Sequence, residues 1–311
     1  MPKPEQNDKP EQTRTPAGTR PKPNERRECP TPRGKLLAIG GSESKERMPK
    51  PDSNQEDNSN FESLQILKRF CQELRGENPM VAVFPTASSI PEEMGRDYRE
   101  VFKKLGINRV EVLDIRTRQD ANDPRYLEIL DKAAGFMFTG GDQLRLTAIL
   151  GGTRLMERLK ERYTDEEIII AGTSAGAAAL STPMIYTGQS DGGFKKGDVY
   201  ITTGLEFMRD VAIDTHFIAR GRIWRMAQAI ATNPQCIGIG LEEDTAILFS
   251  EGNYLEVVGS GLIVIVDGKG MTQTNITEVD PGVPITIRDL KVHMLGKGDR
   301  YTLPVQDQQH K

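Results

Sequence analysis

From residue 34 onward, short apolar runs alternate with amphipathic segments along the chain. Apolar runs predict buried strands, and apolar residues three or four apart predict helices. The expected strands are KLLAIGG (35–41), MVAVFPTAS (80–88), RVEVLDI (109–115), GFMFTGG (135–141) and EEIIIAGTS (166–174). The expected helices are FESLQILKRFCQEL (61–74), PEEMGRDYREVFKKLGI (91–107), DPRYLEILDKA (123–133) and one long helix over 142–163. This alternation favours an α/β fold in which helices cover both faces of a mostly parallel sheet, a three-layer sandwich.

Beyond Thr187 the pattern becomes richer in strands. A Gly-rich loop leads to a strand at 211–217 and a helix at 220–233, and a segment with several apolar runs follows at 237–268. We expect this C-terminal part to extend the same sheet.

Two polar segments interrupt the alternation. Residues 1–33 contain eight prolines and no aromatic residue, so they cannot bury enough apolar surface to offset ordering and predict a disordered tail. Residues 43–60 follow the first strand and predict a long surface loop. The remaining chain, 34–311, is expected to form a single α/β catalytic domain.

Composition narrows the function classes. The chain has no apolar run long enough to cross a bilayer, and its first residues lack the apolar core of a secretory signal, so we expect no membrane partner and a cytoplasmic location. A net charge of −4 argues against nucleic-acid binding. The three cysteines, Cys29, Cys71 and Cys236, are far apart and lack the spacing of a zinc site. We therefore expect no metal and no cofactor.

The motif GTSAG, from Gly172 to Gly176, lies between an expected strand and a helix of small residues. This is the context in which G-x-S-x-G forms a nucleophile elbow, because flanking glycines let the strand and helix pack around a strained turn. Ser174 is therefore the candidate nucleophile. The N–H of Ala175, at the helix start, is a candidate oxyanion donor.

A serine nucleophile needs a base, and the chain contains three histidines, His216, His293 and His310. His310 lies in the polar C-terminal end, and His293 falls in an alternating segment typical of a half-buried strand. His216 stands at a strand end among charged neighbours, which favours it as the base.

The third member of such a site is a carboxylate that orients the imidazole. Glu242, Glu243 and Asp244 follow the apolar strand CIGIGL. The period of two places Glu243 opposite its neighbours, but the residues themselves leave the choice open. The turn FTGGDQ (138–143) ends a strand and opens a helix, so Gly141 is a second candidate oxyanion donor.

Several linked motifs resemble the cyanophycinases, which belong to the same serine-peptidase group as aspartyl dipeptidase E and have a fold like class I glutamine amidotransferases. The resemblance spans about residues 34–268 and rests on GKLLAIGG, FTGGDQ, AGTSAGA, DTHFIARGRIWR and GIGLEEDTAI. It implies a catalytic triad of Ser174, His216 and Glu243.

The resemblance also implies a substrate. Cyanophycinases cut cyanophycin, a poly-aspartate backbone with an arginine on each β-carboxylate, through an acyl-enzyme and release β-Asp-Arg dipeptides. The matching substrate-binding positions are Gln143, Asp214, Thr215, Arg220, Arg222 and Arg225. Guanidinium groups can hold carboxylates as forked pairs, although a solvated helix face also explains Arg222 and Arg225. Thr215 departs from the family, which has glutamine there.

Three other functions fit parts of the pattern. An aspartyl or isoaspartyl dipeptidase uses the same triad, but the R-x-R-x-x-R run favours the polymer. An inactive binding homologue keeps the fold without the chemistry. An α/β-hydrolase esterase places its histidine last, whereas His216 precedes Glu243. The expected partner is an aspartate- and arginine-rich polymer. A homodimer stays open, as does the choice between internal and terminal cleavage.

Overall fold

The computed structural model describes residues 30–41, 43, 62, 64–188 and 193–304. Nearly all of the predicted tail (1–33) and of the predicted loop (43–60) lies outside these residues. Within the described part, no helix is long and apolar enough to cross a membrane.

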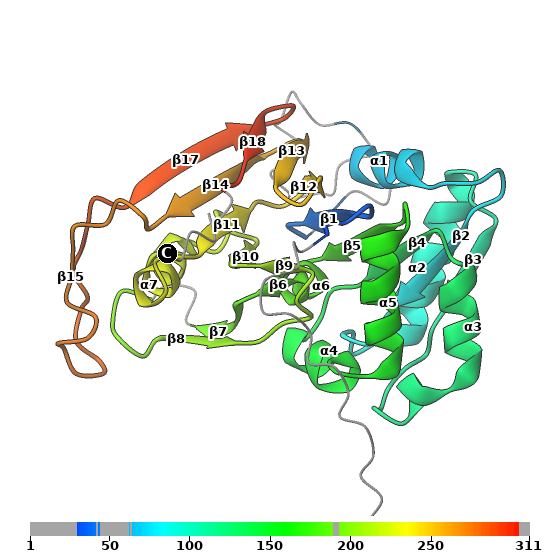
Figure 1. Cartoon of the computed structure of the whole chain (residues 1–311), viewed down its shortest axis with the longest axis horizontal. Coiled ribbons are helices and arrows are strands. Elements are labelled where there is room, and N and C mark those ends of the chain that lie inside the picture. Colours follow the sequence, from blue (N-terminus) through cyan, green and yellow to red (C-terminus); the bar gives the residue numbers. More distant parts are fainter. Residues whose placement is uncertain (1–29, 42, 44–61, 63, 189–192, 305–311) are drawn as a thin grey trace, which may run out of the picture. The chain divides into compact units, whose positions relative to one another are not determined.

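A sheet of eight strands, in the order β18-β13-β12-β1-β5-β4-β2-β3, forms the core of the described domain (Figure 1). Five neighbouring strands run parallel: β1 (Lys35–Ile39), β5 (Ile169–Thr173), β4 (Gly135–Phe138), β2 (Met80–Phe84) and β3 (Arg109–Val112). Three antiparallel strands extend it: β12 (Thr245–Ser250), β13 (Tyr254–Gly259) and β18 (Arg300–Thr302). The parallel strands β2, β4 and β5 read as continuous apolar runs because both of their faces are buried.

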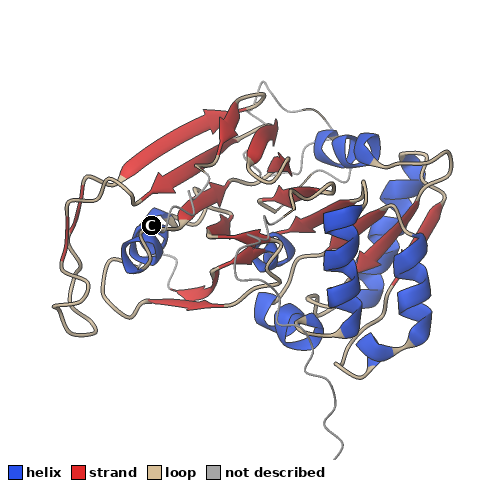
Figure 2. Cartoon of the chain, in the orientation of Figure 1, coloured by secondary structure: helices blue, strands red, loops and turns tan. Residues whose placement is uncertain are grey.

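Helices cover both faces of this sheet, as the alternation predicted (Figure 2). On one face, α1 (Gln65–Glu73) and α2 (Pro91–Lys104) pack against side chains such as Leu37 and Ile39. On the other, α3 (Pro124–Lys132), α5 (Arg154–Asp165) and α6 (Ala175–Leu180) pack against side chains such as Leu36 and Ala38. A short 3-10 turn, η1 (Asp120–Asn122), precedes α3. The three-layer prediction is confirmed.

The single helix predicted over 142–163 is wrong. The structure has two helices there, α4 (Gln143–Leu150) and α5, separated by Gly151 and Gly152. Gly152 has a φ of +64°, a left-handed conformation that ends a helix readily at glycine. Thr153 then caps α5 by accepting a hydrogen bond from the Met156 N–H.

The expectation that the whole C-terminal part extends the first sheet is also only partly right. Strands β12, β13 and β18 do so, but six others form a second sheet in the order β17-β14-β11-β10-β6-β9. Its strands are β17 (Lys291–Gly296), β14 (Leu262–Asp267), β11 (Ile237–Leu241), β10 (Val211–Thr215), β6 (Ser181–Thr182) and β9 (Met208–Arg209). The chain changes sheet at 242–244, where Asp244 adopts a φ of 47° and turns the backbone sharply.

The helix α7 (Ile223–Thr232) packs on the second sheet through Met226 and Ile230. Beside it lies the hairpin of β7 (Met184–Gly188) and β8 (Val199–Thr202), and β15 (Gln273–Thr274) pairs with β16 (Ile287–Arg288). Strands β1, β5 and β10 end at Ile39, Thr173 and Thr215. The residues that follow these three strand ends meet at one site.

Candidate active site

Ser174 stands in the turn between β5 and α6. Its backbone adopts a φ of 51° and a ψ of −113°, a conformation that a serine reaches only under strain. Two glycines make the turn sterically possible. A Cβ on Gly172 would come within 2.5 Å of the backbone of Gly176, and one on Gly176 would come within 2.3 Å of the Phe138 carbonyl oxygen. Strand, strained turn and helix thus occur where the G-x-S-x-G spacing predicts them.

His216 lies one residue beyond β10 and also has a left-handed backbone, with a φ of 50°. Its Nε2 lies 3.0 Å from Ser174 Oγ, and its Nδ1 lies 2.6 Å from Glu243 Oε1. The Nδ1–H tautomer satisfies both contacts, because Nδ1 then donates to the carboxylate and Nε2 accepts the serine hydroxyl. The imidazole is almost buried, so this orientation is well held.

The turn between β11 and β12 separates the three carboxylates that the sequence left open. Glu243 is the one whose carboxylate meets the imidazole. Glu242 points instead to the loop beyond the histidine, where its Oε2 accepts the N–H groups of residues 218–219 at 2.5 and 3.2 Å. Asp244 accepts a hydrogen bond of 2.6 Å from the Ser260 hydroxyl.

The backbone at the end of β1 supports the turns that carry Ser174, His216 and Glu243. The carbonyl oxygens of Ile39, Gly40 and Gly41 accept the N–H groups of Ser174, His216 and Asp244, each at 2.9 Å. Gly41, with a φ of +104°, lies against the imidazole, and a Cβ there would come within 2.5 Å of ring atoms Cε1 and Nε2. The histidine ring therefore occupies the space that a side chain at position 41 would need.

Glu43 forms a buried hydrogen-bond network behind the serine. The side chain is 3% exposed. Its Oε2 accepts the hydroxyl of Thr173, which directly precedes Ser174, at 2.6 Å, and its Oε1 accepts the hydroxyl of Tyr98 on α2 at 2.6 Å. Burial, reinforced by the neighbouring Glu43 carboxylate, raises the pKa of Tyr98 well above its usual range. The network ties the nucleophile turn to helix α2.

The two predicted oxyanion donors are Ala175, which directly follows Ser174, and Gly141, in the turn after β4. In the described part of the chain, the N–H groups of Gly141 and Ala175 have no backbone acceptor. A Cβ on Gly140 would lie 3.4 Å from the Ser174 Cβ, so the Gly140–Gly141 turn is in contact range of the serine. Gly141 has a φ of +141°, and a Cβ there would come within 2.0 Å of the Ala87 carbonyl oxygen. Only glycine fits at position 141.

Asp214, just before the candidate base, is buried and neutralised by arginines. It accepts hydrogen bonds from both Nε (2.5 Å) and Nη2 of Arg225, and from Nη1 of Arg222 at 3.1 Å. Arg225 is 4% exposed, so it does not form a solvated helix face, and its fork is directed at Asp214. Burial is the main cause that lowers the pKa of Arg222 to about 10. The Arg222 Nε is buried without a partner in the described structure.

The remaining predicted binding residues lie in different environments. Arg220 is exposed, and its guanidinium has no ion pair within the described residues. The side-chain amide of Gln143 donates to the carbonyl oxygens of Ile185 and Tyr186 at 3.2 Å each. Thr215 is the last residue of β10 and is buried. The structure thus brings Asp214, Arg222 and Arg225 together and leaves Arg220 facing solvent.

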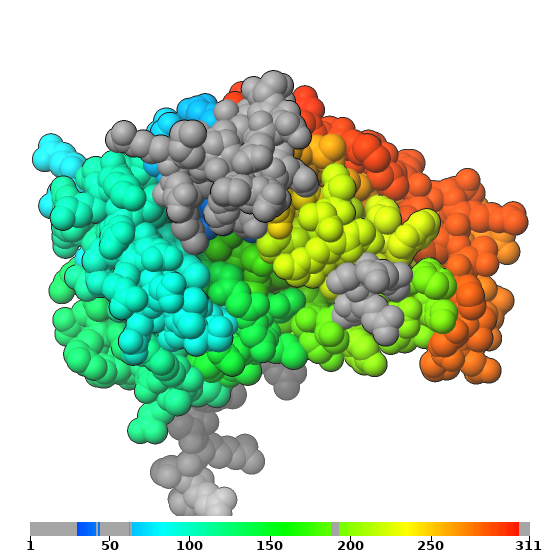
Figure 3. All heavy atoms as spheres, turned by 180° about the vertical axis from the view of Figure 1, so that it is seen from behind, coloured from blue at the N-terminus to red at the C-terminus, as the bar shows by residue number. Residues whose placement is uncertain are grey.

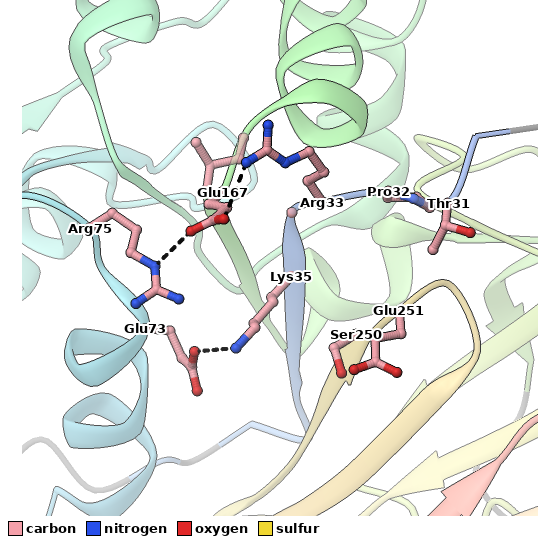
Figure 4. A pocket seen from close by; sticks show the side chains of 11 residues that line it. Thr31, Pro32, Arg33, Lys35, Glu73, Arg75, Glu167, Ser250 and Glu251 are labelled. Atoms are coloured by element: carbon pink, nitrogen blue, oxygen red, sulfur yellow. Dashed lines mark hydrogen bonds and ion pairs between the residues drawn. The ribbon is translucent and has the colours of Figure 1, made fainter.

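Two other features of the described chain lie apart from this site. His293 is on β17, where its ring lies 5.5 Å from that of Tyr301. A cavity of about 320 Å³ lies at the opposite end of β1 (Figure 4). There Lys35 pairs with Glu73 at 2.6 Å, and Glu167 pairs with two arginines, at 33 and 75, each at 3.2 Å. These ion pairs hold the chain segments of that edge together.

Sequence reasoning assigned no role to Gly41 or Glu43. Both follow the first strand in AIGGSES, where two glycines end a strand as they do at 140–141. Ligand and catalytic sites of parallel sheets form beyond the carboxyl ends of the strands. Strand β1 pairs directly with β5, which carries Ser174 at its end. The pair of glycines that follows β1, like the pair at 140–141, is therefore the signal that could have pointed to Gly41 and Glu43.

Several known proteins are similar to this chain. The model of Peptidase family S51 matches residues 52–257. The cyanophycinase of Synechococcus elongatus is 37% identical over 279 residues, covering 90% of this chain and 82% of that protein. The cyanophycinase of Geminocystis herdmanii (strain PCC 6308) is 36% identical over 269 residues, covering 86% and 93%. The crystal structure of a peptidase from an acI-B1 Actinobacterium has a TM-score of 0.61 at 23% identity, covering 89% of this chain and 99% of that one; this supports the fold.

Proposed function

Because the chain belongs to peptidase family S51, we propose that it is a cyanophycin-hydrolysing serine peptidase that releases β-Asp-Arg dipeptides through an acyl-enzyme. The observation that carries the proposal is the hydrogen-bonded chain from Ser174 to His216 to Glu243, with contacts of 3.0 and 2.6 Å. A serine hydroxyl, an imidazole and a carboxylate in this order are the groups that acyl transfer needs.

Ser174 Oγ attacks the scissile carbonyl while His216 Nε2 takes its proton. The Glu243 carboxylate keeps the Nδ1–H tautomer and stabilises the imidazolium that forms. The imidazolium then gives its proton to the leaving amine, and a water molecule, activated by the same imidazole, hydrolyses the acyl-enzyme. The strained backbone at Ser174 holds its hydroxyl at the end of β5, so little reorganisation precedes attack.

The backbone N–H groups of Gly141 and Ala175 would stabilise the oxyanion of the tetrahedral intermediate. Two observations support this assignment: neither group has a backbone acceptor in the described chain, and Ala175 directly follows the serine while the Gly140–Gly141 turn is in contact range of it. Preorganised donors of this kind contribute about 2.7 to 4 kcal/mol each to the transition state.

The predicted substrate-binding residues differ in burial, and their roles differ accordingly. Arg220 is exposed and can hold a substrate carboxylate, together with Arg222, whose buried Nε has no partner among the described residues. Arg225 acts mainly through Asp214, since its fork is fully engaged there. Gln143 has one amide oxygen left as an acceptor, and Thr215 offers a shorter side chain than the family's glutamine.

The test is Ser174→Ala, with Ser250→Ala as the matched control at the far end of the sheet. Ser174→Ala should keep the fold and lower kcat on cyanophycin by roughly ten thousandfold or more, because only oxyanion and binding effects remain. Product analysis by mass spectrometry should give β-Asp-Arg with the parent and the control. If Ser174→Ala kept a tenth of the parent rate, or the parent released only single aspartates from Asp-X dipeptides, the proposal would be wrong.

A further inference from the structure

A second cavity lies beside the oxyanion turn, at the carboxyl ends of β2 and β3 and the start of α2. It measures about 170 Å³. Its polar lining residues are Thr86, Ser88, Ser89, Asp114, Arg116 and Arg145. None of them belongs to the predicted triad, oxyanion hole or binding set. The cavity therefore needs its own explanation.

The cavity adjoins the reaction centre through the turn that carries the oxyanion donor. Gly140 is in contact range of Ser174 on one side, and Gly141 is pressed against the carbonyl oxygen of Ala87 on the other. The same oxygen accepts the Asp142 N–H at 2.9 Å. The segment after β2 that lines the cavity is thus separated from Ser174 only by this turn. Figure 3 shows the cyan surface from the first third of the chain beside the green surface from its middle.

Thr86 provides the first sign of a ligand. The residue is 5% exposed, and its hydroxyl has no hydrogen-bond partner in the described structure. A buried hydroxyl without a partner destabilises the folded protein, because it has given up its hydrogen bonds to water. A bound polar group that meets this hydroxyl recovers that free energy.

Charge provides the second sign. Arg116 is neutralised, because its guanidinium bonds to Asp114 at 2.6 Å and to Glu92 at 3.2 Å. Arg145 forms a hydrogen bond of 3.2 Å to the Ser88 carbonyl oxygen and has no acidic partner among the described residues. With Arg116 paired to both of these acids, Arg145 is the arginine of the described lining that is left to meet an anion. The charge and the hydroxyls together suit an anion.

We propose that this cavity is a substrate subsite that binds the carboxylate of a polymer unit beyond the two units that are joined by the bond cleaved at Ser174. The inference rests on the proposed cyanophycin hydrolysis. In that polymer the β-carboxylate of each aspartate is joined to the arginine amine, so the arginine's own carboxylate is the anion that each unit still carries. Arg145 holds it as a forked pair, and the hydroxyls of Thr86 and Ser88 complete the site.

The experiment uses β-Asp-Arg oligomers of two, three and four units and compares kcat/KM across the series. In the parent, kcat/KM should rise when the oligomer becomes long enough to fill the subsite. Arg145→Ala should remove about ten- to a hundredfold of that rise, the loss of one charge-assisted pair, with a smaller effect on the two-unit substrate. The rise in kcat/KM with oligomer length in Arg145→Lys should lie between those of the parent and Arg145→Ala, because lysine keeps the charge without the fork. Arg99→Ala, an exposed arginine on α2 that does not line the cavity, is the matched control.

Thr86→Val separates binding from structure. Removing an unpartnered buried hydroxyl should leave urea stability unchanged or raise it, while the gain from the longer oligomer falls. If Arg145→Ala kept the parent's length dependence, or lowered all lengths equally, the subsite would be rejected while the proposed function stood. If the parent cleaved no oligomer and no polymer, the proposed function would fail and the subsite with it.

Discussion

The buried network around Glu43 leads to a prediction about how the nucleophile turn is held. Thr173→Val keeps the shape of the side chain but removes the hydroxyl that donates to Glu43 at 2.6 Å. The acceptor is a carboxylate that is 3% exposed, so one of its oxygens loses a donor that water cannot replace. Hydrogen bonds to charged groups contribute about 1.5 to 3 kcal/mol, and we expect the free energy of unfolding to fall by this amount.

Urea denaturation measures that change directly. With a denaturant slope of about 3 kcal/mol per M, the midpoint should fall by roughly 0.5 to 1 M. The matched control is Thr164→Val, whose hydroxyl donates to a neutral helix carbonyl at 3.0 Å and should change stability by less than about 1 kcal/mol. Glu43→Gln by itself already weakens the hydrogen bond between Thr173 and residue 43. The double variant with Thr173→Val should therefore lose less than the sum of the two single losses, by at least about 0.5 kcal/mol.

Loss of the hydrogen bond to Glu43 should also lower activity, because Thr173 directly precedes the strained Ser174. Acylation by a small activated ester, measured where each variant is fully folded, should slow by about tenfold in Thr173→Val for 1.4 kcal/mol of lost positioning. A Thr173→Val protein with parent stability and parent acylation rate would refute the reasoning. Strictly additive losses in the double variant would also refute it, since they would mean that the two side chains act independently.

Three further predictions concern other contacts. Gly41→Ala places a Cβ within 2.5 Å of the His216 ring at a φ of +104°. We expect about 1 to 3 kcal/mol of strain and a corresponding drop in the rate of ester acylation. An unchanged acylation rate would contradict the position of the His216 ring. Arg225→Lys removes the fork from buried Asp214 and should lower urea stability by roughly 2 kcal/mol or more, whereas Arg220→Lys, at an exposed position, should stay within about 0.5 kcal/mol. Arg69 on α1 and Glu256 on β13 form a forked pair at 3.0 Å, which lowers the pKa of Glu256. The stabilisation from this pair is present above the unfolded pKa of glutamate and is lost as pH falls through the lowered folded pKa, so the stability difference between the parent and Glu256→Gln should be about 1 kcal/mol at pH 7 and should close toward pH 3. A stability difference independent of pH would exclude the ionic contribution.

The sequence by itself determined the features that depend on neighbouring residues. Apolar runs such as MVAVF and GFMF specify buried parallel strands because each residue is enclosed on both sheet faces. The glycines of GTSAG specify the tight strand-to-helix turn at Ser174, since each leaves no room for a Cβ. The periodicity did not locate the break at Gly151 and Gly152, because apolar spacing continues across a helix end that left-handed glycine backbone decides.

The tertiary structure alone decided which distant groups meet. The apolar runs of β11 and β12 look alike, and only the sharp turn at Asp244 sends them into different sheets and presents Glu243 to the imidazole while Glu242 binds the neighbouring loop. Arg225 and Asp214 read as two polar residues near a histidine, but burial joins them into one ion pair. Glu43 and Thr173 are 130 residues apart, and the pairing of β1 with β5 brings them together. Contacts of this kind depend on strand order, and no local spacing along the chain encodes them.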